Sequence, residues 1–256
     1  MAEEEAETTS LKYQSLFPEI QPLSSRDLLH DTLSHAQSSP TNNNNTPQWT
    51  IHGKKVILVD VRSRPEREVS MISGAISIDE FRNEVLPSLL RSLDDGLQLD
   101  DEQPHHHSRQ NGIVVATYCT IGYRSGVEAR KLVSDYPSVF SNHDDDSDDS
   151  NTSDDEEVDR PIKIYNMDGI IPFANSTLDE EIQNNTTLPP LLIEPISKQS
   201  TNRVHVYGSA WEKYLLTQEG ILEPVVFSKI HFLWRGISDI GRSFCLRCGC
   251  CNGCIK

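Results

Sequence analysis

Two near-continuous apolar runs constrain the fold of this 256-residue chain more than any other feature. They occupy 55–61 and 112–118, and a third, shorter run follows at 162–166. Runs of this kind indicate strands buried on both faces of a sheet. Helical patterns lie between them, at 24–36, at 78–93 with a break near Pro87, and at 125–136. Buried strands that alternate with helices predict an α/β fold, a central parallel sheet with helices on both faces.

Three polar stretches interrupt this pattern, at about 37–48, 94–110 and 141–159. Each has too little apolar surface to offset the entropy of ordering it, so we expect long disordered insertions within the domain. The sequence thus predicts an acidic, disordered N-terminus at 1–19, a domain at 20–216 and a separate tail at 217–256. Three adjacent histidines, 105–107, stand in the second insertion, where a solvated loop is favoured over a metal site.

The formal net charge of −16 disfavours nucleic acid as a partner. The chain has no apolar run long enough to span a bilayer. Its first residues are rich in glutamate and lack the basic residues of a secretory or transit signal. We therefore expect a cytoplasmic chain whose cysteines do not form a disulfide framework.

Cys119 stands where the second buried strand ends, just before the helix predicted at 125–136. The tight loop between them contains Gly122, which permits a backbone conformation that other residues resist. Successive N–H groups and the helix N-terminus can then stabilise a thiolate without an adjacent histidine. The pattern favours a reactive cysteine over a buried structural one.

The segment Cys119-Thr120-Ile121-Gly122-Tyr123-Arg124-Ser125 resembles the active loop of the rhodanese-like family, Cys-x-x-Gly-x-Arg-Ser. Upstream, 58–62 resembles its Asp-Val-Arg motif, and 71–76 its His-Ile-Pro-Gly-Ala-Ile segment, with Met71 and Ser73 in place of histidine and proline. The late Leu-x-Gly-Gly turn is similar to 167–170, where Ile170 replaces the second glycine. The resemblance extends over about 20–216 and implies a rhodanese-like fold.

The resemblance implies a sulfurtransferase that needs no cofactor and no metal. Cys119 would take sulfane sulfur from thiosulfate or a persulfide donor and pass it, as a Cys119 persulfide, to a thiol or cyanide. The partners would be a small anionic sulfur donor and a thiol acceptor. Arg124 would hold the donor or, alternatively, fix the loop through an ion pair, with Asp60 as its suggested partner. Arg62 would support the same network, Tyr123 would line the pocket mouth, and the donor would contact the remaining loop residues, Thr120, Ile121, Gly122 and Ser125.

Two other functions stay open at this point. Phosphatases and arsenate reductases of similar fold place arginine six residues after cysteine, whereas Arg124 is five after Cys119, so the shorter loop fits sulfur better than phosphate. A non-catalytic rhodanese-like interaction module at a membrane is the other alternative, although such modules often lack the cysteine.

The tail differs in charge from the rest of the chain. Residues 225–256 hold five basic groups against one acidic group, a net +4, which leaves −20 on 1–224. Apolar residues recur at helical spacing from Val226 to Phe244, and five cysteines follow: Cys245, Cys248, Cys250, Cys251 and Cys254. We expect peripheral membrane contact through 225–256, with these cysteines as candidates for lipidation. A zinc or iron–sulfur site is the second interpretation, and an unmodified tail the third.

Overall fold

The computed structural model describes residues 2–38, 47–96, 112–141, 162–184, 191–206, 208–215 and 222–227. Its centre is a seven-stranded sheet whose main path runs β1-β8-β6-β3-β2. The bounds are β1 Gln21–Leu23, β2 Thr50–Ile51, β3 Lys54–Asp60, β5 Ile76–Ser77, β6 Ile113–Tyr118, β7 Phe140–Ser141 and β8 Ile162–Met167. Every pairing is parallel except that of β2 with β3. The predicted mixed α/β fold with a central, mostly parallel sheet is therefore confirmed.

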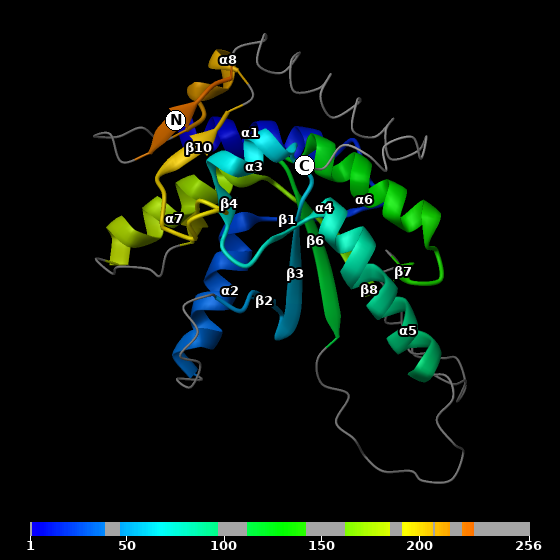
Figure 1. The fold of residues 1–256 in the computed structure, drawn as a ribbon. Helices are drawn as coiled ribbons and strands as arrows, with labels where there is room; N and C mark the ends of the chain where they lie inside the picture. Colours follow the sequence, from blue (N-terminus) through cyan, green and yellow to red (C-terminus); the bar gives the residue numbers. More distant parts are fainter. Residues whose placement is uncertain are drawn as a thin grey trace, which may run out of the picture.

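Alternation along β3 divides the core into two layers. Val56 and Leu58 point into one apolar cluster, together with residues of α2 (Ser25–Ser38) and α7 (Ile170–Asn184). Val59 lies in the other cluster, with residues of α5 (Leu86–Gly96) and α6 (Tyr123–Asp135). Figure 1 shows these helices on opposite sides of the strands. Both faces of the sheet are covered, which explains why its strands read as continuous apolar runs.

Smaller elements complete the described part of the chain. They are α1 (Ala2–Gln14), α3 (Arg64–Val69), α4 (Ile78–Glu80), α8 (Ser209–Glu212), β4 (Met71–Ile72), β9 (Leu192–Ile193), β10 (Arg203–His205) and β11 (Glu223–Val225). β4 pairs with β9 and β10 with β11, forming two separate two-stranded sheets. In Figure 1, α1, α3 and β10 lie at the end of the molecule where β3 and β6 finish. This is the carboxyl end of the parallel strands, where open α/β sheets place their sites.

The predicted disorder of 1–19 is wrong for the described residues 2–19. α1 is a helix that packs on the domain: Ala6 is buried, and Gln14 Nε2 donates to the carbonyls of Leu23 and Asn166 at 3.3 and 2.8 Å. Beyond the helix, Phe17 is buried against Gly126 of α6, so closely that a Cβ on Gly126 would lie 2.2 Å from the ring. The buried residues of α1 are small or polar. The helix therefore has no apolar face that hydrophobic periodicity in the sequence could reveal.

Two further expectations need correction. The segment 78–93 does not break at Pro87, because α4 continues through a π-helical turn (Phe81–Val85) into α5. The wider turn lies just before the proline, whose missing N–H cannot make a helical bond. The separate tail does not begin at 217, since β11 pairs with β10 and Leu222 is buried in the core.

The other segment predictions are tested only at their edges. Of the three expected insertions, 39–46, 97–110 and 142–159 lie outside the described residues, while 37–38 extends α2, 94–96 extends α5 and Ser141 ends β7. The five tail cysteines and the three histidines also lie outside the described residues. In the part of the chain that is described, no helix combines the length and apolarity that a membrane crossing needs.

Candidate active site

Cys119 follows β6 directly and is a free, buried thiol with 1% of its surface exposed. Two donors contact its sulfur. The backbone N–H of Gly122 lies 3.2 Å from Sγ and the Ser125 hydroxyl 3.6 Å from it. Both groups donate to sulfur, and donors in this arrangement are suited to a sulfur anion.

Gly122 is the residue that turns the chain from the loop into α6. It is the N-cap of that helix with φ of +93°, in the left-handed region that glycine adopts without strain. The 13-residue helix then begins at Tyr123, and its N-terminal end lies beside the sulfur. The partial positive charge of a helix N-terminus adds to the Gly122 N–H that donates to the sulfur.

Neighbouring elements hold the loop carbonyls from outside. The N–H groups of Ile170 and Ile171, at the start of α7, donate to the carbonyls of Cys119 and Thr120 at 2.9 and 3.3 Å. Because the C=O and N–H of a trans peptide point in opposite directions, the N–H groups of Thr120 and Ile121 point away from α7. Asn166 Nδ2 donates to the Gly122 carbonyl at 2.9 Å in the same way.

The turn before α7 fits this loop only with glycine at position 169. Gly169 has φ of +119°, and a Cβ there would lie 2.5 Å from the Thr120 carbonyl oxygen. Ile170, which replaces a glycine of the family pattern, supplies the N–H that holds the Cys119 carbonyl. The departure from the pattern thus retains the backbone donor.

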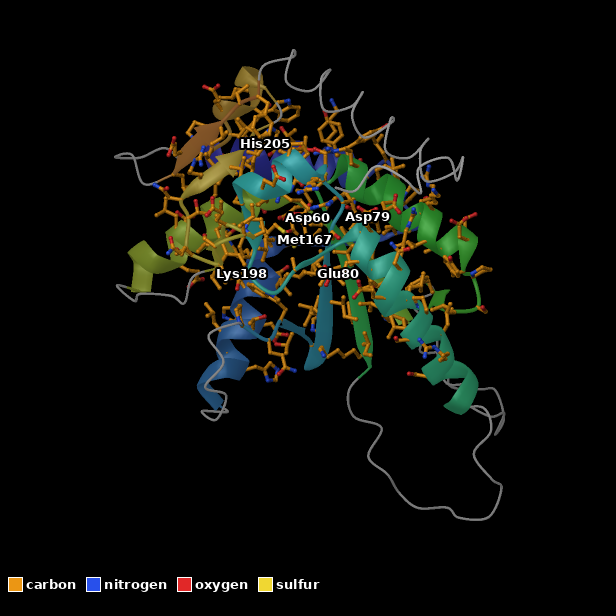
Figure 2. All side chains as sticks on the ribbon, viewed as in Figure 1. Asp60, Asp79, Glu80, Met167, Lys198 and His205 are labelled. Carbon is orange, nitrogen blue, oxygen red and sulfur yellow. The ribbon has the colours of Figure 1, made fainter. Side chains whose placement is uncertain are left out.

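Asp60 and Arg62 form a fully buried ion pair where β3 ends. Arg62 Nη2 lies 2.6 Å from Asp60 Oδ2 and also donates to the carbonyl of Ser70 at 2.6 Å. Burial opposes the charge on Arg62, but the Asp60 carboxylate outweighs it, so the pKa of Arg62 is raised above its usual value. Figure 2 labels Asp60 and Met167, the last residues of β3 and β8 on either side of β6, with His205 above them. The pair ties the end of β3 to the segment that leads into β4.

Arg124 pairs with Glu66 of α3 and not with Asp60, the partner suggested by the sequence. Its two terminal nitrogens donate to the two Glu66 oxygens at 2.8 and 2.7 Å, and Nη2 also donates to Thr120 Oγ1 at 3.1 Å. The fork therefore joins α3, the loop and α6. Because the Glu66 side chain is fully buried and its charge is matched, this ion pair belongs to the framework of the site.

Glu66 is the main site residue that the sequence analysis missed. It also accepts from the backbone N–H and hydroxyl of Ser63 at 2.9 and 2.6 Å, and its Oε1 lies 3.3 Å from Nδ1 of the buried His205. Burial raises the pKa of Glu66, but the hydrogen bonds from Arg124 and the nearby Nδ1 of His205 outweigh it and place the pKa well below its usual range. The signal available was its position, four residues after Arg62 in the segment that begins α3. Asn166 and His205 carried no comparable signal.

Tyr123 is 46% exposed, and its ring packs edge-on against Tyr13 of α1 at a centroid distance of 5.7 Å. Among the loop residues, Tyr123 and Arg124 have accessible side chains, whereas Thr120, Ile121 and Ser125 are buried. No group of three or more histidine, cysteine or carboxylate side chains that could hold a metal ion occurs within the described ranges.

Taken together, the loop can hold a sulfur anion at the carboxyl edge of the sheet, between N–H donors and a helix N-terminus. The comparison with curated proteins and the comparison with solved structures gave no match. A protein-family model, the rhodanese-like domain, matches residues 48–146, a segment that contains Asp60, Glu66 and the complete Cys119 loop. Residues 48–146 are therefore a rhodanese-like domain.

Proposed function

We propose that this protein is a sulfurtransferase in which Cys119 is the nucleophile. The observation that supports this most is the contact of Cys119 Sγ with Gly122 N–H at 3.2 Å, in a loop whose arginine is bound to Glu66. The rhodanese-like domain family often has this activity, which adds independent support. The thiolate and the surrounding N–H donors are the two requirements of covalent sulfur transfer.

The reaction has two balanced steps. The Cys119 thiolate attacks the outer sulfur of thiosulfate or of a persulfide, the S–S bond of the donor breaks, and its electron pair leaves on sulfite or on a thiolate. A thiol or cyanide then attacks the outer sulfur of the Cys119 persulfide, the Sγ–S bond breaks, and the Cys119 thiolate returns. N–H donors around Sγ stabilise the anion in both steps.

The ion pair of Arg124 bears on donor binding. Both terminal nitrogens are engaged by Glu66, so the pair is neutral as a whole. A small anionic donor would then be held mainly by the N–H groups of the loop and the N-terminus of α6, with the exposed part of Arg124 at its edge.

The test is mass spectrometry of the intact protein after thiosulfate treatment, compared with the Cys119→Ser variant. We expect a gain of one sulfur on the wild type, localised to Cys119 by peptide mapping, and none at position 119 in the variant. Thiosulfate:cyanide activity should fall to background in Cys119→Ser. A wild-type protein that gains no sulfur and has no activity would instead support a non-catalytic interaction module.

A second proposal concerns the location of the protein. Residues 225–256 carry the basic charge and the five tail cysteines, whereas the rest of the chain is acidic. We propose that this segment, through acylation of two or more cysteines, gives peripheral contact with a membrane on its cytoplasmic side. Its support is the sequence pattern alone.

A further inference from the structure

Ser10 of α1 lies at the junction of the Cys119 loop and the turn before α7. It is fully buried, and its Oγ lies 2.7 Å from the carbonyl oxygen of Asp168 and 3.3 Å from that of Ile121. One hydroxyl proton therefore serves two acceptors from segments that are distant in sequence. Ser10 lies outside residues 48–146, the part matched by the domain family.

The contact with Ile121 matters because of the peptide unit to which that carbonyl belongs. The Ile121 C=O and the Gly122 N–H are the two ends of one trans peptide and point in opposite directions. The Gly122 N–H is the group that donates to Cys119 Sγ at 3.2 Å. A hydroxyl that holds the carbonyl end from outside thus directs the N–H end at the sulfur.

The hydroxyl is held in place by the packing of the rest of α1. Gln14, one turn further along, donates to two backbone carbonyls, and Phe17 packs under α6. On the loop side, a Cβ on Gly122 would lie 3.3 Å from Ser10 Oγ. The loop and α1 are therefore in close contact. Glycine at position 122 leaves the room that the Ser10 hydroxyl needs to reach the loop carbonyl.

We propose that Ser10 is a positioning residue for the nucleophile, acting through the Ile121–Gly122 peptide. The proposal deepens the proposed function and rests on it only for the identity of Cys119 as the nucleophile. Loss of the hydroxyl frees the peptide to rotate and weakens the hydrogen bond to sulfur. The sulfur then becomes a poorer anion, while the residues that contact it are unchanged.

The experiment uses the full chain and compares Ser10→Ala with Gln14→Met. Both variants remove buried hydrogen bonds from the same face of α1, and both should lower the thermal midpoint, but only Ser10 bonds to a loop carbonyl. The readout is the rate of iodoacetamide alkylation at Cys119 as a function of pH. Peptide mass spectrometry separates this site from the tail cysteines.

We expect alkylation of Ser10→Ala at neutral pH to be about two- to tenfold slower, the range that one hydrogen bond supplies, with its pH midpoint moved upward. Gln14→Met should keep the wild-type rate and midpoint. Equal rates in Ser10→Ala and wild type, or the same loss in both variants, would overturn the proposal. The alkylation test is independent of sulfur transfer, so a wild type that fails to gain sulfur from thiosulfate contradicts the proposed function alone.

Discussion

At the scale of single residues, the site combines two kinds of buried charge. The Asp60–Arg62 and Glu66–Arg124 pairs are matched carboxylate and guanidinium groups, each with further hydrogen bonds, as buried charges require. Asp168 is different, because no cation contacts it among the interactions that the structure describes. Its Oδ2 accepts from the backbone N–H and hydroxyl of Ser25 at 3.1 and 3.0 Å. Burial raises the pKa of Asp168 to about 7, although the two bonds from Ser25 lower it.

This shift makes stability depend on pH. Because the folded state binds the proton more tightly than the unfolded chain, stability falls as the pH rises from about 4 to about 7. Asp168→Asn keeps an acceptor for Ser25 and removes the titration. We expect the free energy of unfolding of the variant, relative to wild type, to increase from pH 4.5 to pH 8 by up to about 3 kcal/mol. Urea denaturation at the two pH values measures this difference, and a difference that does not change with pH would contradict it.

Arg124→Lys tests whether the Glu66 pair serves the framework or the donor. A lysine retains the charge but supplies one contact where the guanidinium supplies a two-point fork. With both Arg124 nitrogens bound to Glu66, we expect sulfur transfer from thiosulfate and from a neutral persulfide donor to fall by the same factor. Steady-state rates with the two donors measure this. A loss confined to thiosulfate would show that Arg124 binds the donor anion.

At the scale of elements, the Cys119 loop is held by segments that precede it and segments that follow it in the chain. β8 and α7 provide Asn166 and the Ile170 and Ile171 N–H groups, α3 provides Glu66, and β10 provides His205. The loop sequence supplies Cys119 and the turn, but these other elements fix its position. This arrangement requires the backbone of the turn before α7 to lie close to the backbone of the Cys119 loop.

Gly169→Ala should disrupt this approach. The added Cβ would meet the Thr120 carbonyl at 2.5 Å and the Ile121 nitrogen at 2.6 Å, and alanine disfavours φ of +119°. We expect a loss of about 2 kcal/mol or more in stability and at least a tenfold slower alkylation of Cys119. Gly208→Ala is the control, since its backbone is extended and no heavy atom lies within 4 Å of the added Cβ. Similar effects of the two substitutions in thermal unfolding and alkylation would refute the prediction.

At the scale of the whole molecule, the net positive charge lies in a different part of the chain from the Cys119 site. Residues 1–224 carry −20 and contain the Cys119 site, whereas 225–256 carry +4. The described structure places the first residues of the basic segment in the domain, because β11 pairs with β10 and Phe227 lies 4.6 Å from His205, ring centre to ring centre. A truncation that removes the tail cysteines should therefore keep Phe227.

We expect full-length protein in cells to sediment with membranes and a chain ending at Phe227 to stay in the supernatant. Hydroxylamine, which cleaves thioesters, should release the full-length form. The physical reason is that basic residues near anionic lipid contribute only about 1 kcal/mol each, so stable contact needs acyl chains. The tail has no membrane role if both forms stay in the supernatant. Copurification of one zinc or iron cluster with the full-length form would favour the metal interpretation.

The sequence alone determined three central strands of the sheet, the position of the Cys119 loop and the class of the domain. These depend on local patterns: continuous apolar runs for strands buried on both faces, and a cysteine, glycine and arginine at fixed spacing in one loop. Such signals lie within a few residues of each other and can be read without contacts. The structure then confirmed β3, β6 and β8 and the helices predicted at 24–36, 78–93 and 125–136, with small shifts of their bounds and no break at Pro87.

Only the tertiary structure decided which groups meet. Arg124 pairs with Glu66, and not with the predicted Asp60, because of where α3 lies. No local sequence pattern indicates which of two buried carboxylates an arginine will meet. α1 was missed because its buried stripe is Ala6, Ser10 and Gln14, which has no apolar periodicity. Its burial comes from hydrogen bonds to the backbone of distant loops, and bonds of that kind exist only once the chain has folded.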